Sequence, residues 1–134
     1  MQDNYGWSPF LLSYNKHSTF SLLVVDARVD IKTSNAFGWS TLMYASFHGF
    51  SQNVKLLLSC GRNLDVNQKT IKDHDFYGKT FKKGSNALDI AKNSPCSNAE
   101  TLQILEQYQR NPKEMQKIFR NQLNLNGKQL VKNN

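Results

Sequence analysis

The sequence has few of the features that mark secreted or membrane-spanning proteins. It contains only two cysteines in 134 residues, Cys60 and Cys96, too few and too far apart for a disulfide framework or a zinc site. Its longest apolar runs hold four residues, as at Leu22–Val25, whereas a membrane-spanning helix needs about 20. The start of the chain lacks the charged and then apolar segment of a secretory signal. We therefore expect two reduced thiols and no membrane span. We also expect an intracellular protein, and we favour the cytoplasm over the nucleus.

The sequence also lacks the common motifs of active sites. It has no glycine-rich phosphate loop and no nucleophile elbow. The three histidines, His17, His48 and His74, are scattered and show no partner pattern of serine, cysteine or carboxylate. Asp73 and Asp75 flank His74, but no second cluster of potential ligands accompanies them. We expect a non-enzymatic protein with no catalytic residue, no cofactor and no metal.

The net charge of +7 is concentrated in two segments. Residues 68–83 carry five lysines against two aspartates, and residues 110–134 carry six basic residues against one glutamate. Residues 1–67, in contrast, carry five basic residues against four aspartates. The packed body is therefore close to neutral, which argues against a basic nucleic-acid-binding core.

The chain repeats itself with a period near 33 residues. The string GWSPF begins at Gly6, and GWSTL begins 32 positions later at Gly38. A weaker third copy, GSNALDIAK, begins at Gly84, 46 positions after Gly38. That distance equals one period plus about 13 inserted residues, so the pattern predicts three units with an insertion before the third.

Each unit has the pattern of a helix, a turn and a second helix. The glycine suits the positive φ of a tight turn. Ser8, Ser40 and Asn86 each follow it by two positions, where a side-chain oxygen can cap a helix N-terminus. In the second unit, the apolar stripe of the second helix is expected at Val54, Leu57 and Leu58, with Gly61 as its stop. In the third unit, Ser97-Asn98-Ala99-Glu100 forms a candidate capping box for the second helix.

These units resemble the ankyrin repeat. The family pattern is roughly G-x-T-P-L-H-x-A-A-x-x-G-H, then an apolar V-x-x-L-L-L run, then G-A-D-V-N. The second unit matches best, at Gly38, Ser40, Leu42, Ala45, Gly49, Val54, Leu56–Leu58, Gly61 and Asp65-Val66-Asn67. The first unit matches at Gly6, Ser8, Pro9, Asp30 and Ile31, and the third at Gly84, Ala87, Leu88 and Ala91. The first unit departs from the pattern, with His17 in place of the mid-unit glycine.

The resemblance implies an all-α solenoid of helix-turn-helix units with turn fingers. The array would span residues 1–109, with units at about 3–35, 36–67 and 84–109 and a finger insertion at 68–83. Three units are about the minimum for a stable array, because each needs neighbours to cover its apolar face. The apolar first unit therefore suggests either a divergent end or a face for a homodimer or a further domain. A mainly structural chain, self-associating or part of a longer array, is accordingly an alternative to the binding scaffold.

Ankyrin arrays mostly bind other proteins, so the resemblance implies a scaffold that holds a partner segment on its concave face. The family's variable positions beside the turn glycine and at the end of the first helix would supply the contacts. Carried over, these positions are Tyr5, Trp7, Asn15, Lys16, Phe37, Trp39, Phe47, His48 and Ser85. Several are aromatic, and rigid aromatics are favoured binding residues. The alternative for the turn aromatics is packing against the neighbouring finger.

The insertion offers a second candidate surface. It places aromatic residues among lysines, at Phe76, Tyr77, Lys79, Phe81, Lys82 and Lys83. Such a mixture suits stacking on nucleic-acid bases with neutralisation of phosphates, or binding of an acidic partner. The alternative is a solvated loop whose aromatics fold back on the third unit.

The last segment, 110–134, is predicted to be a capping helix followed by a flexible basic tail. Asn111, Pro112 and Glu114 fit the N-cap, N1 and N3 positions of a helix. Apolar residues then recur on one face, at Met115, Ile118, Phe119 and Leu123. We expect this helix to cover the open end of the third unit, with a partner-binding or membrane-surface helix as the alternatives.

Overall fold

The computed structural model of the chain describes residues 34–60 and 64–123, and these form two helix pairs, a β-hairpin and a final helix. The elements are α3 (Thr41–His48), α4 (Ser51–Ser59), β1 (His74–Phe76), β2 (Lys79–Phe81), α5 (Ala87–Asn93), α6 (Ala99–Arg110) and α7 (Pro112–Gln122). The described part is thus mostly helical, as expected, but the two-stranded sheet means that the fold is not purely all-α. Tyr5, Trp7, Asn15 and Lys16 lie outside the described residues.

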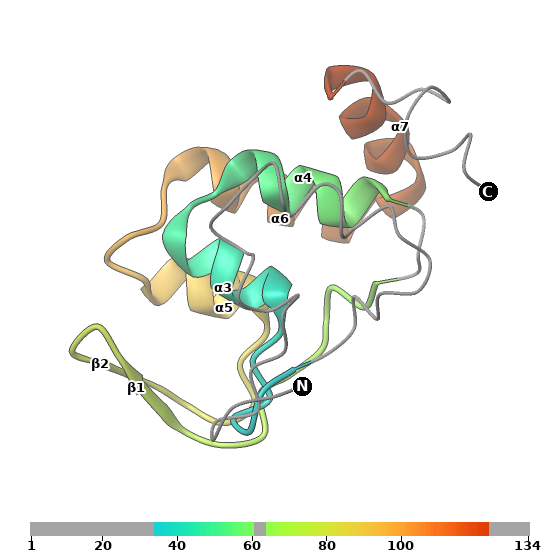
Figure 1. Cartoon of the computed structure of the whole chain (residues 1–134). Helices are drawn as coiled ribbons and strands as arrows, with labels where there is room; N and C mark the ends of the chain where they lie inside the picture. The colour runs from blue at the N-terminus through green and yellow to red at the C-terminus, as the bar shows by residue number, and fades with distance from the viewer. Residues whose placement is uncertain (1–33, 61–63, 124–134) are drawn as a thin grey trace.

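The first pair, α3 and α4, stacks on the second, α5 and α6, so that each of two layers holds one helix from each pair. Helix α3 packs against α5 in one layer, and α4 packs against α6 in the other (Figure 1). The hairpin leaves the chain between the two pairs and lies at the end of the molecule away from α7 (Figure 1). Two successive helix pairs with a finger between them are the arrangement that the repeat pattern predicts. Membership of the ankyrin family stays a prediction.

The helix starts follow the capping residues identified from the sequence. Ser40 caps α3: its Oγ accepts from the Met43 N–H at 3.3 Å, and its own N–H donates to the Met43 sulfur at 3.4 Å. Asn86 caps α5 by the same reciprocal arrangement with Asp89, at 2.9 and 3.1 Å. These bonds satisfy N–H groups that a helix leaves free in its first turn.

The start of α6 differs from the predicted capping box. Asn98 is the N-cap, and its side chain accepts from the Thr101 N–H at 2.8 Å. The Ser97 hydroxyl instead donates to the Ser46 carbonyl of α3 at 2.8 Å. The predicted capping box was wrong: the N-cap is Asn98, one position later, and Ser97 bonds to the end of a neighbouring helix rather than to the start of its own.

Three side chains from the α5–α6 turn satisfy carbonyls at the end of α3. Besides Ser97, the Ser94 hydroxyl donates to the Phe47 carbonyl at 2.6 Å, and the Asn98 amide donates to the Gly49 carbonyl at 3.0 Å. The last carbonyls of a helix have no partner within the helix itself. The contact between the two helix pairs is therefore held by directional hydrogen bonds as well as by apolar packing.

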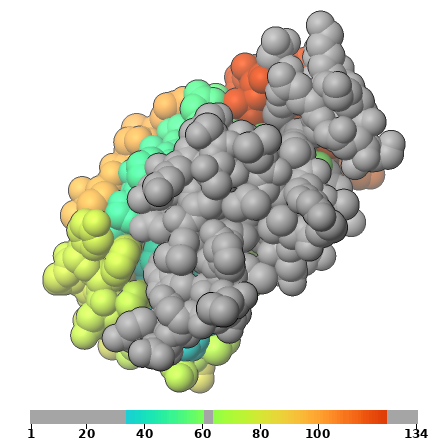
Figure 2. Space-filling view, in the orientation of Figure 1, coloured from blue at the N-terminus to red at the C-terminus, as the bar shows by residue number. Residues whose placement is uncertain are grey.

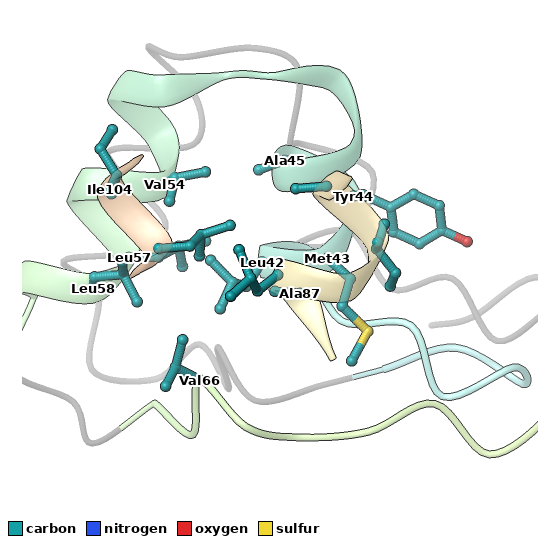
Figure 3. Close-up of a cluster of buried hydrophobic side chains, with 14 of the residues drawn as sticks. Leu42, Met43, Tyr44, Ala45, Val54, Leu57, Leu58, Val66, Ala87 and Ile104 are labelled. Carbon is teal, nitrogen blue, oxygen red and sulfur yellow. The ribbon is translucent and has the colours of Figure 1, made fainter. Parts of the chain in front are cut away.

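The apolar core lies between the two pairs. Leu42 of α3, Leu57 of α4 and Ala87 of α5 meet there, with Ile104 of α6 beside Val54 (Figure 3). The predicted stripe of α4 is buried, as Val54, Leu57 and Leu58 are all almost inaccessible. The predicted stop at Gly61 lies outside the described residues.

Helix α7 begins at Pro112, as predicted, and packs against both α4 and α6. Phe119 is buried, and Met115, Ile118 and Leu123 pack beside it, which confirms the predicted apolar face. Arg120 extends to α4, where its Nε donates to the Ser59 carbonyl at 2.6 Å. The helix therefore also secures the end of α4, which belongs to the second predicted unit.

Candidate partner-binding surface

Residues 68–85, which we call the finger, are anchored at their base to the turn before α3. The Ile71 N–H donates to the Phe37 carbonyl at 3.0 Å, and the Thr70 N–H donates to the Ser85 carbonyl across the finger at 2.9 Å. Gly38 has a φ of +79°, and a Cβ there would lie 2.7 Å from the Ile71 nitrogen. Glycine is required at this turn both for its backbone conformation and for the close approach of the finger.

The outer part of the finger is an antiparallel hairpin with a two-residue turn. The strands pair with His74 opposite Phe81 and Phe76 opposite Lys79. The turn residues Tyr77 and Gly78 both have positive φ, +55° and +74°. Two positive φ angles fit a turn whose twist matches the hairpin. For tyrosine, however, the left-handed conformation costs about 1–2 kcal/mol, so the surroundings of Tyr77 must offset this strain.

One face of the hairpin packs on α3 through a group of rings that we call the aromatic cluster. It consists of Trp39, Phe47, Phe76, Phe81 and Tyr77. Its centre is Trp39, which has no exposed surface. The Trp39 ring lies edge-on to Phe76 and Phe81, with centroids 5.6 and 5.4 Å away, and is tilted against Phe47 of α3 at 6.2 Å. Aromatic pairs in these geometries stabilise by about 0.5–1.5 kcal/mol beyond the area they bury. The hairpin is therefore fixed to α3 by ring packing rather than projecting as a free loop.

The aromatic cluster reaches the surface at Tyr77, beside His48. The Tyr77 ring lies 5.2 Å from Phe47 and 5.5 Å from His48, yet 61% of the residue remains exposed. The His48 ring stacks on Phe50 at 5.4 Å. These contacts orient Tyr77 and help to offset the strain at its backbone. Tyr77 is therefore an exposed ring held in place by the packed rings beneath it.

The other face and the rim of the hairpin carry its charges. Asp75 Oδ1 accepts from the Thr80 hydroxyl at 2.6 Å, and Asp73 Oδ1 accepts from the Lys83 N–H at 2.8 Å. Asp73 also lies 3.7 Å from the Lys82 ammonium. Both aspartates are thus engaged within the finger.

Four further lysines give the finger its positive potential. All four are exposed, and none lies within 4 Å of a carboxylate in the described parts of the chain; they are Lys69, Lys72, Lys79 and Lys83. The five lysines of the finger outnumber its two aspartates, so its net charge stays positive although Lys82 pairs with Asp73.

The two described histidines flank the aromatic cluster. His74 stacks on Phe37 at 4.0 Å and on Phe76 at 5.3 Å. Burial lowers the pKa of His74, and the charge of Asp75 opposes that shift. Burial also lowers the pKa of His48. The neutral imidazole is favoured at both positions because the charged form loses hydration there.

The structure corrects two of the predicted contact residues. Trp39 and Phe47 have no exposed surface, so the expectation that their rings face a partner was wrong. The physical reason is the finger: its own aromatics Phe76 and Phe81 cover them. Phe37 is only half-buried but stacks on His74, so the packing alternative for the turn aromatics describes this side better.

The remaining predicted residues divide by exposure. His48, Ser85 and Phe76 are half-buried, whereas Phe81 is buried. The exposed members of the predicted insertion surface are Tyr77, Lys79, Lys82 and Lys83. The insertion was expected to be a finger or a loop folding back on the third unit. Its aromatics instead pack on Trp39 and on α3, which lie in the second predicted unit.

Two features near the hairpin were not predicted from the sequence. Phe50 supports His48, and Ile71 is 58% exposed at the base of the finger. The hairpin itself had a local signal in the sequence. The pair Tyr77-Gly78 lies between two short segments, 74–76 and 79–81, that contain both aromatic and polar residues.

Comparison with known proteins gives no match: no protein-family model fits the chain, and no curated protein and no solved structure is significantly similar to it. Over residues 34–60 and 64–123, no helix has the length and apolar character needed to cross a bilayer. In the same residues, histidines, cysteines and carboxylates do not gather into a group that could hold a metal ion.

Proposed function

We propose that the chain is a non-enzymatic protein-interaction module of ankyrin-like repeats. The hairpin at the outer end of the finger and the adjoining end of α3 present its binding surface to a segment of another protein. The observation that carries this proposal is Tyr77, an exposed ring at a strained backbone position, supported from below by Phe47 and His48.

Three properties of Tyr77 favour binding. Its ring contributes a large contact area with few rotatable bonds, so little entropy is lost when a partner covers it. Its orientation is fixed before binding by the packing of the aromatic cluster. Its left-handed backbone is a costly choice that glycine or asparagine would avoid, and such strain is characteristic of functional positions.

The alternative, nucleic-acid binding through the basic finger, is supported by the same lysines. It is weakened by the burial of Phe81 and the inward packing of Phe76, which leave Tyr77 as the finger ring most available for stacking on a base. A binder of single strands usually offers successive rings to successive bases. We therefore prefer a protein partner.

The test is selection of peptides from a random display library against the full chain. We expect selected peptides to lose at least about tenfold in affinity on Tyr77→Ala, the equivalent of about 1.4 kcal/mol. Ile71→Ala is the matched control, because Ile71 is similarly exposed but lies at the base of the finger. Circular dichroism of both variants checks that the helices are retained.

Peptides that bind the Tyr77→Ala variant as tightly as the original chain would contradict the proposed surface. Failure to select any peptide, together with binding of single-stranded RNA or DNA that weakens steeply with salt, would favour the alternative.

A further inference from the structure

We propose that the outer edge of β2 binds an acidic, extended segment of a partner protein by strand addition. This inference rests on the proposed function and specifies the partner's chemistry. It starts from the topology of the finger, whose sheet has only β1 and β2 among the described residues.

The two arms of the finger have different neighbours. The first arm is bonded to the preceding turn, where the Ile71 N–H donates to the Phe37 carbonyl. The second arm contains β2, and no further strand pairs with it in the described parts of the chain. In Figure 2 the yellow-green residues of the finger lie at the margin of the molecule. The sheet has no third strand beside either β1 or β2 in the described residues, so the choice of the β2 edge rests on the charges of the two arms.

The register identifies the backbone groups that this edge offers. In an antiparallel hairpin, hydrogen-bonded and non-hydrogen-bonded pairs alternate, and a two-residue turn is closed by a hydrogen-bonded pair. Phe76 with Lys79 closes the turn, so Asp75 with Thr80 is the next, non-hydrogen-bonded pair. The backbone N–H and C=O of Thr80 therefore point away from β1, toward the open edge.

Charge determines which strand fits this edge. Lys79 lies on β2, and Lys82 and Lys83 follow it directly, all three exposed. The acidic residues Asp73 and Asp75 lie on the other arm and are engaged within the finger. Lysines on an open edge discourage pairing with a second copy of the same basic strand. They favour an acidic strand, because specificity follows from both repulsion and attraction.

The experiment uses the full chain and a fluorescent ten-residue peptide that alternates glutamate with threonine or valine. We expect this peptide to bind, and its lysine-for-glutamate counterpart to fail. Thr80→Pro removes the outward N–H, whereas the control Thr80→Val removes the same hydroxyl and keeps the N–H. Thr80→Pro is expected to weaken binding about threefold to tenfold relative to Thr80→Val, as expected for one hydrogen bond. Circular dichroism confirms that each variant is folded.

A second arm does not depend on mutation. The same acidic peptide is made in two forms, with N-methyl groups on the odd-numbered or on the even-numbered backbone nitrogens. Both forms keep their charges, but each has lost the N–H donors along one of its two edges. Strand addition predicts that one of the two loses binding. Equal binding by both N-methylated peptides, or by the Thr80→Pro and Thr80→Val variants, would overturn the inference.

The outcome is distinguishable from that of the proposed function. If the acidic peptide fails to bind but library peptides bind through Tyr77, the inference is wrong and the protein-interaction module stands. If a polythymidine strand binds more tightly than the acidic peptide, the acidic-partner assignment is overturned.

Discussion

Replacement of Trp39 by alanine should destabilise the whole protein rather than remove a binding residue. Trp39 is completely buried, and its ring touches residues of α3 and of the hairpin, including Tyr44, Phe47, Phe76 and Phe81. Removal of a buried tryptophan ring costs about 3–5 kcal/mol. A domain of this size has a total stability of about 5–15 kcal/mol, so the variant should lose a large share of it.

A second substitution at the same position refines the expectation. The Trp39 Nε1–H finds no hydrogen-bond partner in the described structure. A buried donor left without a partner costs about 1–3 kcal/mol, and phenylalanine has no such donor. Trp39→Phe removes part of the ring, which destabilises the fold, but it also removes the unpaired donor, which stabilises it. The loss of unfolding free energy should therefore be less than about half of that for Trp39→Ala.

Urea unfolding followed by far-ultraviolet circular dichroism measures both variants without relying on tryptophan fluorescence. The expected order of stability is the original chain, then Trp39→Phe, then Trp39→Ala. A loss below about 1 kcal/mol for Trp39→Ala would refute the reasoning, since it would mean that the aromatic cluster does not hold the finger.

Two further substitutions test helix contacts elsewhere in the described structure, and a double histidine variant tests the pH dependence of stability. Gly49→Ala should cost about 2–3 kcal/mol in urea unfolding, because Gly49 has a φ of +72° and a Cβ would lie 2.6 Å from the Asn98 amide nitrogen; an unchanged midpoint would contradict this close approach. Arg120→Gln should cost about 1–2 kcal/mol by removing the bond to the last turn of α4, and equal stability would show that α7 does not need it. The lowered pKa values of His48 and His74 mean that the unfolded chain binds protons more readily than the folded one. Their contribution to stability is therefore complete above the ordinary pKa of 6.5 and is lost as the pH falls through the lowered folded pKa; the urea midpoint should drop between about pH 7.5 and about pH 5.5, and less so in a variant with glutamine at both positions.

Local features of the fold were predictable because short-range chemistry determines them. Ser40 and Asn86 cap helices because their side chains accept from N–H groups three residues later. Gly38 and Gly84 have the positive φ expected of turn glycines. The apolar face of α7 follows from its helical period alone. Each of these needs only a few neighbouring residues to be recognised.

The fate of the turn aromatics was not predictable in the same way. Trp39 and Phe47 are buried by Phe76 and Phe81, which follow them in the sequence by about 30–40 positions. No periodicity links these segments, since the finger interrupts the repeat. Ser97 was not predictable for the same reason. Its hydroxyl donates to the carbonyl of Ser46 in α3, which lies far earlier in the sequence, instead of capping the adjacent helix α6.

The aromatic cluster and the finger are therefore parts of one structure, which decides how the basic finger can be tested. Deletion of residues 68–83 would remove Phe76 and Phe81 and uncover Trp39 and Phe47, with a stability cost on the scale of the Trp39 substitution. Loss of binding after such a deletion would not distinguish a lost contact from a lost fold. Substitution of the exposed Tyr77 or Lys79 leaves the buried rings of Trp39, Phe47 and Phe81 in place, so such changes separate the binding surface from the support beneath it.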